Sequence, residues 1–293
     1  MSCLCAILSF NHAEITRKAI SSALQFFLSE NILLVHNGSE QKNVSLLQDY
    51  FPEINHHVIE ENKGYSGGVN GAFNWFLDSR KDFQWFFLVT NDCEVEHFLD
   101  HSLLKKLLEG VYAPRILFKS GKIDSLGGIV NCRRGRPLHL RLGEGVEGPL
   151  VLKESEFLYV PGSSFLISRG LLKKVGGLDE RIFTFWDDID WSLRLQQQSG
   201  KIFLLPEVVL KHGGGKTTHH QQLYTTYYYQ RNRWAVSKRY LSFAGKWHLF
   251  FWWWRDAIQF RGLSLFKKHP EKSHPVFLMR KAWAERNLPN KTV

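Results

Sequence analysis

The sequence is poor in cysteine, with four residues that form neither a CxxC pair nor the dense pattern of a disulfide scaffold. It also has no uncharged apolar run of the roughly eighteen residues that a membrane-spanning helix requires. Residues 1–28 lack the basic start of a secretory signal, and Asn11, His12 and Glu14 interrupt their apolar stretch. We therefore expect a protein of the reducing cytoplasm with no transmembrane segment.

Proline is also scarce, and no low-complexity tract occurs. Nine prolines stand against 22 Phe, 10 Trp and 9 Tyr, and 44% of the residues are hydrophobic. A disordered chain is weakly hydrophobic and highly charged, whereas 293 residues of this composition can bury a full core. The composition predicts a globular protein of one large or two small domains.

Acidic residues are rare near the C-terminus. Residues 212–293 hold 15 Lys and Arg but only 3 Asp and Glu, a balance of +12 in a chain whose net charge is +10. The aromatic run WHLFFWWWR, from Trp247 to Arg255, lies in the same region. The expected partner of this region is an anionic surface that also accepts aromatic side chains.

Apolar runs of strand length alternate with segments of helical period in the first half, which predicts βα units and a mostly parallel sheet. The expected strands are residues 4–10, 32–36, 58–60 and 85–90, and the expected helices are residues 15–28, 44–50, 69–78 and 103–108. Short β-rich pieces follow over residues 111–168, then a helix at 187–198 and strands at 202–205 and 208–211. We expect a domain of residues 1–215 and a helical, basic and aromatic region of residues 216–293.

Glycine is missing from the first strand-to-helix turn, residues 9–12, and no P-loop motif occurs. A dinucleotide-binding dehydrogenase or a P-loop enzyme is therefore disfavoured. The glycines lie instead in ENKGYSGGVNGAFNWF, residues 61–76. Such a segment before a helix can bring backbone N–H groups to a phosphate, although a plain strand-to-helix turn explains it equally well.

Three further segments hold candidate chemical groups. Asp92 follows an apolar strand, where its carboxylate can bind a hard cation or cap the next turn. Asp187, Asp188 and Asp190 crowd the start of a helix, and adjacent carboxylates raise one another's pKa, which suits a general base. A helix N-terminus also favours acidic residues for structural reasons alone. His212 precedes three glycines, which leave room for a metal or phosphate, although a lone histidine is more often a core or loop residue than a ligand.

Taken in order, these segments resemble the inverting family 2 glycosyltransferases of the GT-A fold over about residues 3–235. ILSFNHAEITRKAISSAL resembles the family's first strand and helix, LLVHNGS its nucleotide-binding VDNGS, and NKGYSGGVNGAF its N-x-G-F-x-G-G-x-N. TNDCEV resembles the metal-binding DxD motif, VPGSSFLISRGLLKKVGGLDERIF the acceptor-side block, WDDID the catalytic-base motif, and the His212 segment the terminal metal-ligand histidine. YYYQRN, residues 227–232, is similar to rhamnosyltransferase-like members, and WDDID also to galactofuranosyltransferases.

The resemblance implies an α/β fold of GT-A type, a Rossmann-like mixed and mostly parallel sheet flanked by helices, with a basic aromatic helical extension. It implies sugar transfer, with inversion, from dTDP-rhamnose or a UDP-sugar to a saccharide or lipid-linked saccharide acceptor, in bacterial surface polysaccharide synthesis. The implied catalytic residues are Asp188 and Asp187, and the implied ligands of Mn²⁺ or Mg²⁺ are Asp92 and His212. The implied donor-binding residues are Phe10, Asn11, Asn37, Asn62, Gly64, Gly67, Gly68, Asn70 and Asn91, and the acceptor-side residues are Gly162, Ser163 and Trp186.

Two positions depart from the family's motifs. His36 stands where VDNGS has its aspartate, which affects the base and ribose contacts. Thr90 stands where the DxD motif has its first acidic or amide residue, so that Asp92, with Glu94 as a second candidate, is the expected carboxylate ligand.

Other interpretations cover part of the chain. Family members that use lipid-linked acceptors work at the cytoplasmic face of the membrane. The basic and aromatic C-terminal region therefore predicts peripheral contact with an anionic membrane surface. A helical core or a homodimer interface would explain the same tryptophans. The basic region could bind nucleic acid, but no RNP, zinc or helix-turn-helix signature is present. A glycoside hydrolase is a further alternative, because such enzymes also use paired carboxylates. A protein that binds a nucleotide without catalysing a reaction would explain why His36 and Thr90 depart from the family's motifs.

Overall fold

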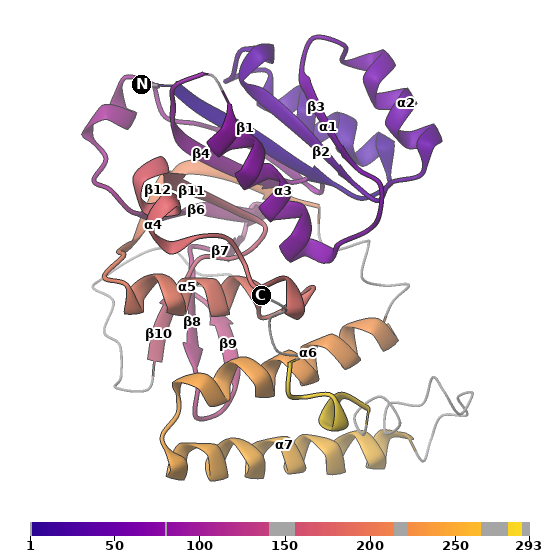
Figure 1. The fold of residues 1–293 in the computed structure, drawn as a ribbon, viewed down its shortest axis with the longest axis vertical. Helices are drawn as coiled ribbons and strands as arrows, with labels where there is room; N and C mark the ends of the chain where they lie inside the picture. The colour runs from indigo at the N-terminus through magenta and orange to yellow at the C-terminus, as the bar shows by residue number, and fades with distance from the viewer. Residues whose placement is uncertain (1, 80, 141–155, 214–221, 265–280, 289–293) are drawn as a thin grey trace.

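The computed structural model describes residues 2–79, 81–140, 156–213, 222–264 and 281–288 (Figure 1). Within them, nine strands form one sheet in the order β3-β2-β1-β4-β11-β6-β12-β5, with β7 paired to β6. The strands are β1 (Ser2–Ser9), β2 (Ile32–Asn37), β3 (Asn55–Ile59), β4 (Phe83–Thr90), β5 (Cys93–His97), β6 (Val111–Phe118), β7 (Ile123–Ser125), β11 (Ser164–Ser168) and β12 (Ile202–His212).

The direction of the strands confirms the expected mixed, mostly parallel sheet. β3, β2, β1 and β4 are parallel neighbours, and β11 is antiparallel to both β4 and β6. β12 is parallel to β6, whereas β5 and β7 are antiparallel to their neighbours. Six of the nine described strands therefore run one way, and the carboxyl ends of β1, β2, β4 and β12 lie at the same edge of the sheet.

Helices cover both faces of the sheet. On one face, α1 (Ala13–Ala23) and α2 (Gln41–Tyr50) contribute Ile20 and Leu47 to a buried cluster with Ile7 of β1. On the other face, α3 (Gly64–Asp78), α4 (Arg169–Val175) and α5 (Asp187–Gln197) contribute Phe73, Leu172 and Trp191 to a second cluster. The sheet is thus buried between two helical layers, as the continuous apolar runs of its central strands require.

A smaller sheet and two C-terminal helices lie beyond α5 (Figure 1). The sheet has the order β10 (Glu156–Tyr159), β8 (Gly128–Asn131) and β9 (Arg136–His139). The helices are α6 (Gln222–Ser237) and α7 (Phe243–Ser264), joined by the 3₁₀ turn η5 (Lys238–Tyr240). A third cluster, which includes Val130, Ile189 and Val236, packs these parts against α5. Three further 3₁₀ turns lie in the described ranges, η1 (Ser29–Asn31), η2 (Leu103–Lys106) and η3 (Glu180–Ile182).

Several boundaries differ from the sequence-based expectation. α2 begins three residues early, and the two strands expected at 202–205 and 208–211 form the single strand β12. α1 ends at Ala23, five residues early, because residues 24–27 form a hydrogen-bonded turn that brings the Phe27 ring 4.6 Å from the Phe98 ring. α3 begins at Gly64, five residues early, so that most of its glycines lie within a helix and not in a loop. β3 begins three residues early, and residues 103–108 hold only the turn η2.

All four cysteines, Cys3, Cys5, Cys93 and Cys132, are free and fully buried. Burial raises the pKa of each thiol. None of the described helices combines the length and the apolar character needed to cross a membrane.

Candidate active site

A cleft of about 360 Å³ lies beside the carboxyl ends of β4 and β12. Its other walls come from β9, from residues 161–163 and from the segment that leads into α5. The cleft brings together every residue that the sequence assigned to catalysis, metal binding and the acceptor side: Asp92, Gly162, Ser163, Trp186, Asp187, Asp188 and His212.

Asp92 and His212 meet in this cleft although 120 residues separate them in the chain. Asp92 comes two residues after β4, and His212 is the last residue of β12. β12 pairs antiparallel with β5, in a register that places His212 opposite Cys93. His212 Nε2 therefore lies 3.2 Å from Asp92 Oδ2.

Asp124 of β7 holds the other side of the His212 ring. Its Oδ2 lies 2.9 Å from His212 Nδ1, and its Oδ1 lies 3.6 Å from Nδ1 of His139 on β9. The hydrogen bonds to Asp124 and Asp92 raise the pKa of His212 to about 9. Burial favours a higher pKa for Asp124, but its hydrogen bonds with His139 and His212 outweigh burial and lower the pKa. A carboxylate behind an imidazole in this way fixes the tautomer and the orientation of the ring.

The donor atoms around Asp92 suit a divalent cation. Thr90 Oγ1 donates a hydrogen bond to Asp92 Oδ1 over 2.7 Å, which leaves Oδ2 directed at His212. The ligand atoms of Asp92, His212 and Cys93 lie within 4.8 Å of one another. Burial keeps the Cys93 thiol protonated, so the carboxylate oxygen and the imidazole nitrogen are the favourable ligands. Mn²⁺ and Mg²⁺ both accept oxygen ligands, and imidazole suits later first-row metals.

Asp187 and Asp188 begin α5 in the same cleft. Asp188 Oδ2 accepts a hydrogen bond from the Gly162 N–H at 2.9 Å, and its Oδ1 accepts one from the Ile189 N–H at 2.8 Å. Asp187 is 4% exposed, and its Oδ2 has no hydrogen-bond partner among the described residues. Burial raises the pKa of both carboxyl groups, and the charge of Asp188 raises that of Asp187 further. A carboxylate in such surroundings gains stability when it takes up a proton.

The segment before α5 has an unusual backbone. Phe183, Phe185 and Trp186 have φ of 65°, 60° and 71°, a region that costs non-glycine residues about 1–3 kcal/mol each. Asn232 of α6 holds this segment, because its Nδ2 donates to three carbonyl groups within residues 182–185 at 2.8–3.0 Å. The C-terminal helices thus support the wall that carries Trp186.

The expected donor-binding residues lie around the carboxyl ends of β1 and β2, and their amides order the backbone there. Asn11 Oδ1 accepts from the Glu40 N–H at 2.8 Å. Asn37 is 3% exposed, and its Nδ2 donates to the Gly64 carbonyl at 2.8 Å. Asn62 Oδ1 accepts from the Gly64 N–H at 2.9 Å and thereby starts α3. Phe10 directly follows β1.

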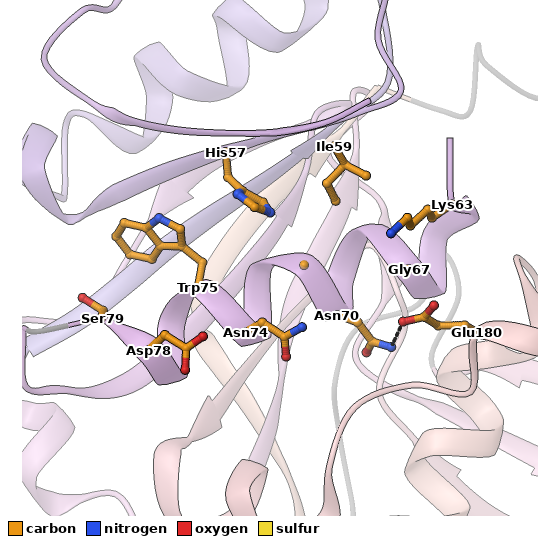
Figure 2. Close-up of a pocket in the computed structure, with 11 residues that line it drawn as sticks. His57, Ile59, Lys63, Gly67, Asn70, Asn74, Trp75, Asp78, Ser79 and Glu180 are labelled. Carbon is orange, nitrogen blue, oxygen red and sulfur yellow. Dashed lines mark hydrogen bonds between the residues drawn. The ribbon is translucent and has the colours of Figure 1, made fainter. Parts of the chain in front are cut away.

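The other expected donor residues are divided between two places. Asn91 lies between β4 and Asp92, and its Nδ2 donates to Thr16 at 3.1 Å. Gly68 packs against β1, because a Cβ atom there would lie 2.7 Å from Leu8 Cδ1. Gly67 and Asn70, in contrast, line a groove along α3 (Figure 2), and the lining of that groove shares no residue with the cleft.

The structure gives physical reasons for the two departures from the family's motifs. His36 is fully buried, its Nε2 lies 3.0 Å from Nδ1 of His56 on β3, and burial, with the charge of His56, lowers its pKa to about 4. Thr90 supports Asp92 directly, as described above. Glu94 does not line the cleft.

Several cleft residues escape sequence reasoning. Asp124 and His139 come from strands of three and four residues, which have no readable period. Tyr65, whose hydroxyl donates to the Gly162 carbonyl, lies within the glycine segment, where the expected donor-binding residues are glycines and asparagines and not this tyrosine. Tyr159 and Tyr229 also line the cleft. All three tyrosines lie within or next to the quoted motifs, because Tyr159 directly precedes VPGSS and Tyr229 lies in YYYQRN.

No protein-family profile matches the sequence, and no curated protein matches it. Solved structures do match the fold. GalNAc-T7, crystallised with UDP, GalNAc and Mn²⁺, gives a TM-score of 0.55 and 13% identity over 96% of this chain and 54% of that chain. Residues 1–349 of S. aureus TarS give 0.51 and 13% over 99% and 81%. The mannosyltransferase PcManGT from Pyrobaculum calidifontis, in complex with GDP-Man and Mn²⁺, gives 0.50 and 10% over 97% and 86%.

These similarities establish the fold. The chain has the GT-A type of α/β fold that the sequence predicts, and it spans about half the length of the GalNAc-T7 chain.

Proposed function

We propose that the cleft transfers a sugar from a nucleotide-diphosphate donor to an acceptor hydroxyl, with inversion at the anomeric carbon. The observation that carries the proposal is the meeting of Asp92, His212 and Asp188 in one cleft of a GT-A fold. The GalNAc-T7 and PcManGT structures, which share the fold, hold UDP and GDP-Man respectively, each with Mn²⁺. The motif resemblance supports dTDP-rhamnose or a UDP-sugar as the donor and bacterial surface polysaccharide as the product.

Asp92 and His212 would hold the Mn²⁺ or Mg²⁺ ion. When bound, the ion would neutralise the charge that develops on the diphosphate as it leaves. A ligating imidazole must be neutral, so His212 would bind the ion through a deprotonated Nε2, and its hydrogen bond to Asp124 Oδ2 would keep the proton on Nδ1. Mixed oxygen and imidazole ligation favours Mn²⁺ over Mg²⁺.

Asp188 is the proposed general base. It takes the proton of the acceptor hydroxyl while that oxygen bonds to the anomeric carbon and the bond from this carbon to the diphosphate oxygen breaks. The N–H groups of Gly162 and Ile189 fix the position of its carboxylate. Asp187 is the adjacent carboxyl group, and the partly buried ring of Phe185, beside the buried Trp186, would give the acceptor sugar an aromatic surface.

A thermal-shift measurement tests the proposal without knowledge of the acceptor. The purified protein is heated with UDP, dTDP, GDP or CDP, each with and without Mn²⁺. We expect one nucleotide to raise the midpoint only with the metal, since a ligand at 100 times its Kd adds about 2.7 kcal/mol to the unfolding free energy. The variants Asp92→Ala and His212→Ala should lose the shift, and Asp49→Ala, an exposed carboxylate on α2, should keep it.

The absence of a shift with every nucleotide, in folded protein, would overturn the proposal. A metal-dependent shift without consumption of any sugar nucleotide would instead support a second candidate, a nucleotide-binding protein that has lost the chemistry. The burial of His36 against His56 favours that candidate, because no carboxylate at this position faces a ribose. Where turnover occurs, the anomeric configuration of the product, measured by NMR, tests inversion.

The helix α7 supports a membrane-bound location for the reaction. Five large apolar side chains on α7 are each more than half exposed: Phe243, Trp247, Phe251, Trp254 and Ile258. Their spacing of four, four, three and four residues places them on one helix face. Leu249 and Trp253 lie on the inner face, where Trp253 packs 4.4 Å from Trp283.

We propose that this exposed face lies on the anionic leaflet of a membrane, at its cytoplasmic side, where a lipid-linked acceptor would be presented. The C-terminal residues 212–293 hold 15 basic and 3 acidic residues, which matches the charge of such a surface. Each Lys or Arg near an anionic leaflet adds about 1 kcal/mol, and the aromatic residues favour the interface.

Vesicle co-sedimentation tests this contact. We expect the protein to bind phosphatidylglycerol vesicles more tightly than phosphatidylcholine vesicles, and less tightly as salt rises. The triple variant Trp247→Ser, Phe251→Ser, Trp254→Ser should lose the binding, whereas Leu28→Ser with Leu108→Ser, two exposed leucines elsewhere, should keep it. If the triple variant still sediments, or only turns a dimer into a monomer, the face serves another purpose.

The division into residues 1–215 and 216–293 also stays a proposal. Its boundary lies within residues 214–221, outside the described residues. The contacts of Asn232 with residues 182–185 imply that the second region, even so, contributes to the site.

A further inference from the structure

A second hollow lies along the outward side of α3, and we call it the α3 groove. Its floor is α3 itself, between Lys63 and Asp78, and one of its walls is β3 (Figure 2). It encloses about 550 Å³, and none of its lining residues lines the cleft. At 1.5 Å per residue, the helix between Lys63 and Asp78 offers a floor of about 22 Å, which suits an extended ligand.

The sequence of α3 creates the hollow. Gly67 and Gly71 are four residues apart, so both lie on the same helix face, and neither carries a side chain that would fill the floor. A Cβ atom at position 71 would lie 2.7 Å from Cδ1 of Ile59, the flexible end of that side chain. Glycine within a helix costs about 1 kcal/mol relative to alanine, so this open floor lowers the stability of the helix.

The groove carries polar groups that the protein itself does not use. The side chains of Lys63, Asn74 and Asp78 make no hydrogen bond or ion pair with any part of the chain that the structure describes. His57, on the β3 side, is likewise without a partner there, and burial lowers its pKa, which leaves a neutral imidazole at pH 7. Each of these groups can therefore bond to a ligand without first losing an internal partner.

Other side chains give the groove a firm shape. Asn70 Nδ2 donates to Glu180 Oε1 at 2.8 Å, and Asn70 Oδ1 accepts from the Leu178 N–H at 2.8 Å. Trp75 is partly buried against the second core cluster, and Figure 2 shows its indole next to His57, in the space between α3 and β3. One rigid aromatic surface thus lies beside several free polar groups.

The charges of the groove indicate the class of ligand. Lys63 at one end is balanced by Asp78 at the other and by Glu180, so a polyanion such as a nucleic acid or a polyphosphate would meet repulsion. Apart from Trp75 and Ile59 the lining is polar or glycine, which does not suit a lipid chain or an apolar helix. An indole face with amide, carboxylate and imidazole groups around it matches the apolar ring faces and the hydroxyl groups of a neutral sugar.

We propose that the α3 groove binds a neutral oligosaccharide, as a site separate from the cleft. The choice of a saccharide among neutral ligands rests partly on the proposed function. If the cleft extends a glycan, the α3 groove would hold another part of the same glycan. Trp75 would contact a sugar ring, and Asn74 and Asp78 would bond to its hydroxyl groups.

Binding is measured by saturation-transfer NMR and calorimetry with neutral hexasaccharides of glucose, galactose, mannose or N-acetylglucosamine, without nucleotide or metal. Gly71→Gln fills the floor and replaces a helical glycine, and Asn74→Ala with Asp78→Ala removes two exposed polar groups, so both variants should fold. We expect at least one hexasaccharide to bind the wild type, and each variant to weaken it by about tenfold or more. Asp49→Ala, a matched exposed site on α2, should bind as the wild type does.

Three results would overturn the proposal: no hexasaccharide binds, the groove variants bind like the wild type, or the binding is lost in Asp92→Ala and kept in Gly71→Gln. The nucleotide thermal shift is recorded for the same proteins. Saccharide binding that depends on Gly71 supports the groove even if no nucleotide binds, and a nucleotide shift without saccharide binding overturns the groove while the proposed reaction stands.

Discussion

At the scale of single residues, the carboxyl groups of the cleft form two pairs: the pKa is lowered in one pair and raised in the other. Burial opposes ionisation of Asp92 and Asp124, but hydrogen bonds with His212, joined at Asp124 by His139, outweigh it and lower both pKa values. At Asp187 and Asp188 burial is the largest influence and raises both pKa values, although the charge of His139 lowers that of Asp188 in part. Asp92 and Asp124 therefore stay ionised and can stabilise a cation, whereas Asp187 and Asp188 have a raised affinity for a proton.

The change Asp188→Asn tests the proposed base. An amide keeps the size of the side chain but cannot accept the hydroxyl proton, so turnover should fall by about 10² to 10⁴. The metal-dependent nucleotide shift should stay the same, because Asp188 is not a proposed ligand of the metal or the nucleotide. Asp187→Asn is the matched control and should lose less activity. A fully active Asp188→Asn enzyme would remove Asp188 from this role.

The change Asp124→Asn tests the support of His212. The amide no longer fixes the proton on Nδ1, so the affinity for Mn²⁺ should fall by about 10- to 100-fold, as measured by calorimetry. His139→Gln removes the second partner of Asp124 without a change at His212, and should have a smaller effect. Equal Mn²⁺ affinity in Asp124→Asn and wild type would show that His212 needs no such support.

At the scale of elements, the sequence predicts the long buried strands better than the short strands and the start of α3. The strands at β1, β2 and β4 lie within two residues of their expected bounds, because uninterrupted apolar runs mark buried strands. The start of α3 is not predicted, because residues 64–68 include three glycines and therefore favour a loop. The hydrogen bond from the Gly64 N–H to Asn62 and the packing of Gly68 against β1 hold these residues in the helix. Asp124 escapes it because β7 is only three residues long, and its place depends on pairing with β6.

The support of residues 182–185 by α6 leads to a prediction at this scale. Asn232→Leu removes a fully buried amide and leaves the Thr184 and Phe185 carbonyl groups without this donor, while Ile182 still accepts from Arg231; the change should cost about 1–3 kcal/mol of unfolding free energy. Turnover should fall as well, because Trp186 and Asp188 follow this segment directly, while nucleotide binding should change little. Lys246→Ala, an exposed change on α7, is the control in urea unfolding. A variant with unchanged stability and turnover would contradict this role of α6.

At the scale of the whole molecule, ion pairs join the C-terminal turn η5 to the α/β part. Arg239 contacts Asp179, which precedes η3, at 3.2 Å, and also contacts Asp190 of α5. Burial favours a higher pKa for Asp179, but Arg181 and Arg239 outweigh it and lower the pKa to about 2. The unfolded chain, with a pKa near 3.8, therefore binds more protons than the folded chain between these two values.

The unfolding free energy of the chain should depend on pH, because the pKa of Asp179 differs between the folded and the unfolded chain. The contribution of Asp179, about 2 kcal/mol, is present in full above pH 5 and is lost as the pH falls through 3.8 towards 2. The gap in unfolding free energy between wild type and Asp179→Asn should thus shrink by about 1 kcal/mol from pH 6 to pH 3. Urea unfolding at several pH values measures it. A gap that does not change with pH would mean that Asp179 titrates alike in both states.

The burial of all four thiols has a practical consequence. Maleimides and disulfide reagents attack thiolates that they can reach, and Cys3, Cys5, Cys93 and Cys132 offer neither access nor a low pKa. The rate at which native protein is labelled therefore reports how often the chain opens. Cys93, beside Asp92, reports opening of the cleft edge, and Cys132, in the third cluster, reports detachment of the C-terminal helices. A single cysteine introduced on the surface would accept a fluorophore at that position alone.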